Sequence, residues 1–208
     1  GDEDTGNFPG AVYVFTRDVS GQWHEQQKLT ASDGTAGDGF GISVATSGDV
    51  ALIGARGDDD LGSTSGAAYF FVKNPDGAWE ESQKVTTSDG AAGDEFGYSV
   101  ALDGESAVIG ARFATGAEGR EGAAYVFTFG SGHIGSLWNE LQKLIGSTTE
   151  DGDGNSSEFG ASVALDEQTI LIGAPRADSR GGSAGAVHVF RFIPEEQDSQ
   201  PWSKVQTM

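Results

Sequence analysis

The 208-residue chain contains no cysteine, and its basic residues are few. The lack of cysteine excludes disulfide bonds and thiolate metal ligands. Only 12 Lys and Arg stand against 32 Asp and Glu, which gives a net charge of −20. Because phosphate recognition needs clustered basic side chains, this charge disfavours nucleic acid and anionic membrane surfaces as partners. No apolar run approaches the roughly 18 residues of a membrane-spanning helix, so we predict no membrane insertion.

One sequence motif occurs three times along the chain. It consists of a Phe-Gly step, a strand of small residues containing Ser-Val-Ala, and a second strand that ends in Ile-Gly-Ala. The steps begin at Phe40, Phe96 and Phe159. A spacing of this size predicts a repeat architecture.

Each repeat carries two further strands. The third is apolar on both faces and is predicted at residues 10–15, 66–71, 122–127 and 185–190. The fourth alternates with Lys, Gln and Glu, which is typical of a protected outer edge strand. It begins at a tryptophan in every copy, and we expect each of these side chains to cover apolar surface: Trp23, Trp79, Trp138 and Trp202. The strand ends in Gln-Lys-Leu or Gln-Lys-Val, and Lys204-Val205-Gln206 is the corresponding end that we assign in the last copy.

Apolar residues with helical spacing are missing, so the sequence predicts an all-β fold. A four-stranded sheet with a small inner strand, a buried middle and a polar outer strand is typical of a β-propeller blade. A β-solenoid and tandem sandwiches fit the repeat length and strand number less well. The predicted division is a half blade at 1–31 and complete blades at 32–87, 88–146 and 147–208, with 14 strands in all.

The Phe-Gly and Ile-Gly-Ala-Pro signatures and the Ser-Val-Ala strands resemble the FG-GAP repeat family. That family builds the β-propeller of integrin alpha chains and of many bacterial surface proteins, so the resemblance implies an extracellular or cell-surface propeller. Two departures matter. Only the last copy has the proline, Pro175, where Arg56 and Arg112 stand in the others. The connections between the first and second strands are too short and too poor in oxygen ligands for the calcium loops of integrins.

Acidic loops elsewhere are candidate calcium sites. Asp151, Asp153 and Asn155 have the 1, 3, 5 spacing of an EF-hand loop, and Glu158 follows them, but the loop lacks the glycine and glutamate of that motif. Asp58 and Asp60 form a second candidate, in the loop after the first Ile-Gly-Ala. The alternative is that these aspartates close turns through their own backbone. Turn formation is therefore the favoured interpretation, and calcium is the one cofactor that the spacing of these residues supports.

Other motifs have simpler interpretations. Residues 56–58 spell Arg-Gly-Asp, an integrin-binding tripeptide, although Gly-Asp at this point also follows the repeat pattern. Asn155 begins an N-glycosylation sequon. The three histidines do not converge in the repeat, and His188 occupies a position that is tyrosine in the other copies. No nucleophile–base–acid set can be assembled, so we predict that the protein is not an enzyme.

The sequence therefore predicts a non-enzymatic extracellular β-propeller module for adhesion, matrix or coat assembly that binds protein or glycan. The alternative is a propeller-type glycan hydrolase or lyase, which would need carboxylates gathered at one end of the axis. The predicted half blade leaves open sheet edges and faces. Either a longer polypeptide supplies the missing strands or neighbouring chains do so by self-association.

Overall fold

The computed structural model describes residues 9–116, 119–132, 135–146, 156–177, 184–193 and 201–208. Within these residues the secondary structure consists of strands and turns without any helix. There is accordingly no helix among them that is long and apolar enough to cross a membrane. The strands are β1 (Val12–Arg17), β2 (Trp23–Leu29), β3 (Ser43–Ser47), β4 (Val50–Ala55), β5 (Ala67–Lys73), β6 (Trp79–Val85), β7 (Phe96–Asp103), β8 (Ser106–Ala111), β9 (Ala123–Gly132), β10 (Gly135–Ile145), β11 (Ser162–Asp166), β12 (Thr169–Ala174), β13 (Ala186–Phe192) and β14 (Trp202–Thr207).

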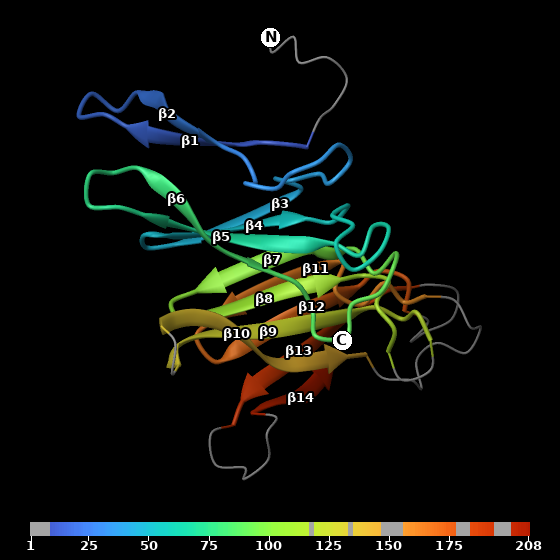
Figure 1. The fold of residues 1–208 in the computed structure, drawn as a ribbon. Helices are drawn as coiled ribbons and strands as arrows, with labels where there is room; N and C mark the ends of the chain where they lie inside the picture. Colours follow the sequence, from blue (N-terminus) through green and yellow to red (C-terminus); the bar gives the residue numbers. More distant parts are fainter. Residues whose placement is uncertain (1–8, 117–118, 133–134, 147–155, 178–183, 194–200) are drawn as a thin grey trace.

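The strands form three four-stranded antiparallel sheets and one two-stranded sheet. Each four-stranded sheet is a meander in chain order: β3–β6, β7–β10 and β11–β14; β1 pairs only with β2. The sheets follow one another as an open fan, from the N-terminal hairpin in blue to the last sheet in red (Figure 1). Strand β7 contacts both β3 and β11, so the first strands of the three units lie together on the inner side of the fan. The all-β prediction is confirmed.

Side chains from the facing surfaces of consecutive sheets form a shared core. Leu52 and Phe70 from sheet β3–β6 pack in one cluster with Phe96 and Trp138 from sheet β7–β10. The rings of Phe70 and Trp138 stack with centroids 4.2 Å apart. The middle strands of sheets β3–β6 and β7–β10 are apolar on both faces because each of these sheets packs between two others.

Backbone contacts repeat at each junction. The Ser43 hydroxyl donates to the Gly97 carbonyl oxygen at 2.8 Å, and Ser99 donates to Gly160 at the same distance. A Cβ on Gly54 would lie 1.9 Å from that Gly97 oxygen, so only glycine allows the sheets to approach this closely. The close approach of consecutive sheets therefore explains the glycine of the Ile-Gly-Ala signature.

The aromatic predictions are confirmed with one exception. The side chains of the three Phe-Gly steps are all buried, and Phe96 is 1% exposed. Trp138 and Trp202 are buried as well, and Trp79 is partly buried. The prediction is wrong for Trp23, which is 66% exposed. Trp138 packs on the preceding sheet, whereas no described sheet precedes the β1–β2 hairpin.

Candidate functional sites at the loop edge

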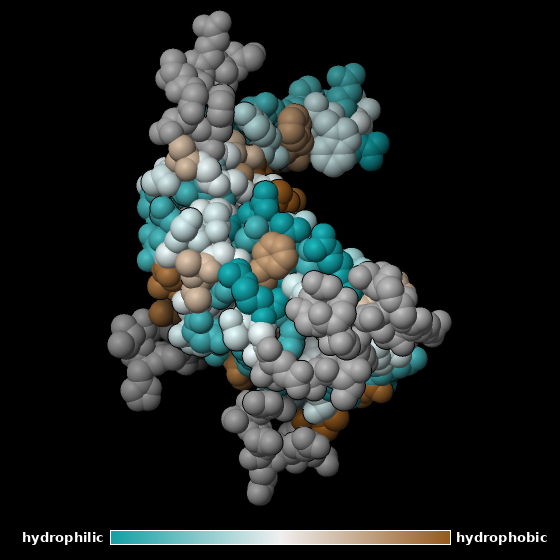
Figure 2. Space-filling view, turned by 90° about the vertical axis from the view of Figure 1, so that its right-hand side faces the viewer, coloured by the Kyte–Doolittle hydropathy of each residue, from teal (hydrophilic) through white to brown (hydrophobic). Residues whose placement is uncertain are grey.

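The loops that enter the first strands and leave the second strands meet at one edge of the fan, which Figure 2 views face-on. Hydrophilic residues cover much of the centre of this face, with a few hydrophobic ones among them (Figure 2). Rigid sheets thereby bring loops from different repeats together, and such loops are where binding residues are commonly found. Two charged clusters lie there.

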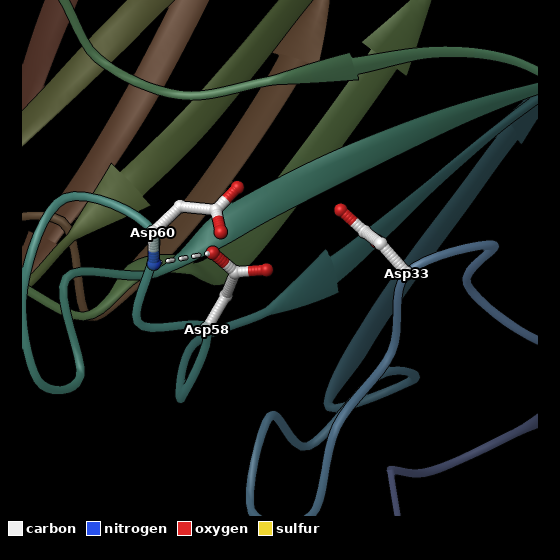
Figure 3. Close-up of side chains that lie close together, drawn as sticks. All are labelled: Asp33, Asp58 and Asp60. Atoms are coloured by element: carbon white, nitrogen blue, oxygen red, sulfur yellow. Dashed lines mark hydrogen bonds between the residues drawn. The ribbon is translucent and has the colours of Figure 1, made fainter.

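The first cluster contains three aspartates from two loops. Asp58 and Asp60 follow β4, while Asp33 precedes β3, and their carboxylates face the space between the loops (Figure 3). One oxygen from each carboxylate lies within 4.8 Å of the others, an arrangement that could hold a metal ion. The Lys84 ammonium on β6 contacts all three carboxylates, with N–O distances of 2.6–2.7 Å.

Strand β5 supplies the floor of this cluster. The hydroxyl of the buried Tyr69 lies 2.8 Å from an Asp33 oxygen and 3.0 Å from an Asp58 oxygen. Burial alone would raise the pKa of Asp33, but hydrogen bonds from Lys84 and Tyr69 outweigh it and hold the pKa below its usual range. Burial alone would lower the pKa of Lys84, and its bonds to the aspartates reverse this and raise it. These two shifts favour the charged forms of Asp33 and Lys84.

The equivalent positions in the next two sheets carry progressively fewer charges. In sheet β7–β10, Lys143 contacts Asp89 at 2.6 Å, Tyr125 donates to the same carboxylate, and Ala114 occupies the position of Asp58. In the last sheet, His188 pairs with Thr207 in the register that joins Tyr69 to Lys84. The predicted strand end at residues 204–206 is therefore wrong by two positions, since Gln206 and Thr207 pair in the register of Gln83 and Lys84.

Calcium does not fit the Asp33, Asp58 and Asp60 cluster while Lys84 stays in place. Calcium requires six to eight oxygen ligands. Here the space among the carboxylates already faces an ammonium group that contacts each of them. Metal binding at Asp58 and Asp60 remains a prediction that requires Lys84 to move away.

Of the other predicted metal ligands, only Glu158 lies within the described residues. Asp151, Asp153 and the sequon residue Asn155 lie outside the described residues. Glu158 is described, and its carboxylate lies 3.2 Å from the Arg176 guanidinium. The turn interpretation gains support in the first unit, where Asp38 accepts hydrogen bonds from both the amide and the hydroxyl of Thr35.

The second cluster joins two sheets through one carboxylate. Glu95 precedes β7, and its Oε2 accepts a 2.8 Å hydrogen bond from Nε of Arg112 and lies 3.2 Å from Nη1 of Arg56. The Arg112 guanidinium lies 4.1 Å from the ring centroid of Tyr98 and 4.5 Å from that of Phe113. The Arg-Gly-Asp tripeptide at residues 56–58 is therefore engaged at both ends. Arg56 contacts Glu95, and the Asp58 side chain is 5% exposed and contacts Lys84.

The sequence signal for this second cluster was present but incomplete. Arg56 and Arg112 were visible as departures from the proline of the repeat. They stand one repeat apart in the chain, and only the junction between consecutive sheets brings both to Glu95.

Residues 23–71, 79–127 and 138–190 each match the family model described as the FG-GAP repeat. The chain belongs to the FG-GAP repeat family. The predicted family is thereby confirmed, and the matched segments of this FG-GAP chain each run from the tryptophan of one unit into the third strand of the next. No curated protein matches the chain.

Among solved structures, the FG-GAP chain is similar to the crystal structure of Sqt1 from Chaetomium thermophilum. The two share 17% sequence identity with a TM-score of 0.48, and the match covers 83% of this chain and 36% of that one. The chain thus spans little more than a third of the length of that structure.

Proposed function

We propose that the four sheets are consecutive parts of a β-propeller and that a further blade covers the outer face of sheet β11–β14. Leu171 and Val187 on this face are 39% and 37% exposed. Their equivalents Leu52 and Ala68 are fully buried beneath the next sheet. Ser162 and Gly173 also line a shallow cavity on this face, at positions equivalent to Ser43 and Gly54 of an occupied junction. The same contact groups are thus available for one more sheet.

We further propose that this propeller is a non-enzymatic extracellular module that binds protein or glycan through its loop edge. The observation that carries this proposal is the meeting of loops from consecutive sheets, where Arg56 and Arg112 reach the same Glu95 carboxylate. Side chains fixed in this way can bind a ligand with little further loss of conformational entropy. The surface location rests on the family, whose repeats are typical of surface proteins.

A glycan and protein-binding screen with the intact chain tests this function. We expect retention of a defined glycan or protein class with the ligand recovered unchanged. A parallel turnover assay with the same glycans separates binding from catalysis. Measurable hydrolysis or elimination would favour the glycan-active enzyme instead.

Calcium stabilisation is the remaining part of the proposal, with Asp151, Asp153 and Asn155 as the ligands. Their 1, 3, 5 spacing in the sequence, as in an EF-hand loop, supports it. Calcium should then raise the thermal unfolding midpoint of the wild-type chain, and the double substitution Asp151→Asn and Asp153→Asn should remove the increase. An unchanged midpoint at millimolar calcium would leave turn formation as the role of these residues.

A further inference from the structure

The Arg56, Arg112, Glu95 and Tyr98 cluster has the features of an anion-binding site. Two guanidinium groups share the Glu95 carboxylate, so these three side chains carry one excess positive charge; Glu158, a further carboxylate that acts on Arg112, is paired with Arg176. This local excess stands out in a chain of net charge −20. Arg56 is half-exposed and Arg112 more enclosed, and both belong to the loop edge.

The Arg112 side chain is already oriented for recognition. Its Nε is engaged by Glu95, and its guanidinium plane lies against the rings of Tyr98 and Phe113. Within the described residues, neither Nη atom of Arg112 has a hydrogen-bond partner, and neither is a buried unsatisfied atom. A guanidinium held at one edge therefore offers its other edge, a planar pair of N–H groups, to a carboxylate.

Backbone strain supports a specific role for Glu95. Its φ is 57°, a left-handed conformation that is uncommon for a residue with a side chain. The equivalent position before Phe40 is Gly39, which adopts a φ of 69° without that cost. Glu158, before Phe159, has a φ of 54° and is likewise paired with an arginine, so a glutamate at this position holds arginines in both units.

We propose that Arg112 and Arg56 bind the carboxylate of a uronate sugar in an acidic glycan. This assignment rests on the proposed binding function and names its ligand class. A uronate presents a planar carboxylate that fits the guanidinium edge in a bidentate manner. It also carries one charge per sugar, and the net charge of −20 repels it less than a densely charged polyanion such as nucleic acid.

The test is binding of a galacturonate oligosaccharide, measured by calorimetry beside its methyl ester of the same length. The ester keeps the sugar and removes the charge, so we expect binding of the acid and little binding of the ester. Arg112→Lys keeps the positive charge but loses the planar pair of donors, and it should weaken binding by about tenfold or more. Arg17→Gln, at an exposed arginine on β1 whose Nε donates to the Gly21 carbonyl oxygen, is the matched control and should bind as the wild type does.

Other outcomes overturn the assignment. Equal binding of acid and ester, or an unchanged affinity in Arg112→Lys, would show that the carboxylate is not recognised at this site. Preference for an oligoglutamate peptide over the uronate would assign the site to an acidic peptide instead. Binding of neutral glycans or proteins alone would overturn this inference while leaving the proposed binding function intact. Thermal unfolding of each variant separates loss of binding from loss of folding.

Discussion

Gln83 and Trp138 bind each other across the junction between two sheets. The Gln83 side-chain amide donates to the Trp138 carbonyl oxygen, and the Trp138 amide donates to Gln83 Oε1, each at 2.8 Å. Gln27 with Trp79 and Gln142 with Trp202 form the same reciprocal pair. The outer strands of consecutive sheets are therefore joined in a repeating way, although no ladder pairs them.

Replacing Gln83 with leucine should destabilise the fold. The substitution leaves the amide and carbonyl of Trp138 without these partners, at a cost of about 1–3 kcal/mol in the free energy of unfolding. Gln206→Leu is the control, because Gln206 is the exposed equivalent on the last sheet and should change stability by less than about 0.5 kcal/mol. Equal effects of the two substitutions in denaturant unfolding would contradict a junction-specific role.

Phe96→Ala should lower the free energy of unfolding by roughly 3–5 kcal/mol. Phe96 is 1% exposed and lies edge-on to Tyr125, with ring centroids 5.6 Å apart. Phe96→Leu fills part of the cavity and should cost less. Equilibrium unfolding in urea measures both variants, and a loss below about 1 kcal/mol for alanine would be inconsistent with a core position.

Lys84→Met should destabilise the protein more than Lys143→Met. Removal of Lys84 leaves three carboxylates facing one another, including the enclosed Asp58, whereas Lys143 faces Asp89 alone among these positions. We expect a difference of about 1–3 kcal/mol, reduced from the buried-pair value because Asp33 and Asp60 are exposed. Millimolar calcium should raise the unfolding midpoint of Lys84→Met beyond any rise in the wild type. An equal response of both proteins would show that Lys84 does not exclude a cation.

His188 should make stability depend on pH in the acidic range. Burial, with a smaller effect from the nearby Lys204, lowers the pKa of His188 to about 4. An unfolded histidine titrates near the ordinary value of about 6.5, so the stabilisation is complete above that pH and declines as the pH falls towards about 4. Between pH 7 and pH 5 the wild type should lose about 1–2 kcal/mol more than His188→Tyr, which restores the residue of the other repeats. Parallel pH dependence of the two proteins would contradict this.

The strands could be predicted from the sequence because the same motif recurs in each sheet. Features that depend on how strands and sheets pair could not. The predicted strand end at residues 204–206 lies too close to Trp202, since counting from Trp202 reaches Thr207 at the place that Lys84 holds relative to Trp79. Asp58 and Asp60 appeared as metal ligands because the ammonium that contacts them comes from another strand. Trp23 occupies the repeat position at which Trp138 and Trp202 are buried. It is exposed because no sheet among the described residues precedes the β1–β2 hairpin.

We infer that the outer face of sheet β11–β14 receives another blade. Sedimentation velocity of the 208-residue chain over a range of concentrations tests whether this exposed face associates. We expect association, and we expect the double substitution Leu171→Lys and Val187→Lys to abolish it without loss of the β-sheet circular dichroism signal. A wild-type chain that remains a monomer up to its solubility limit would contradict the claim.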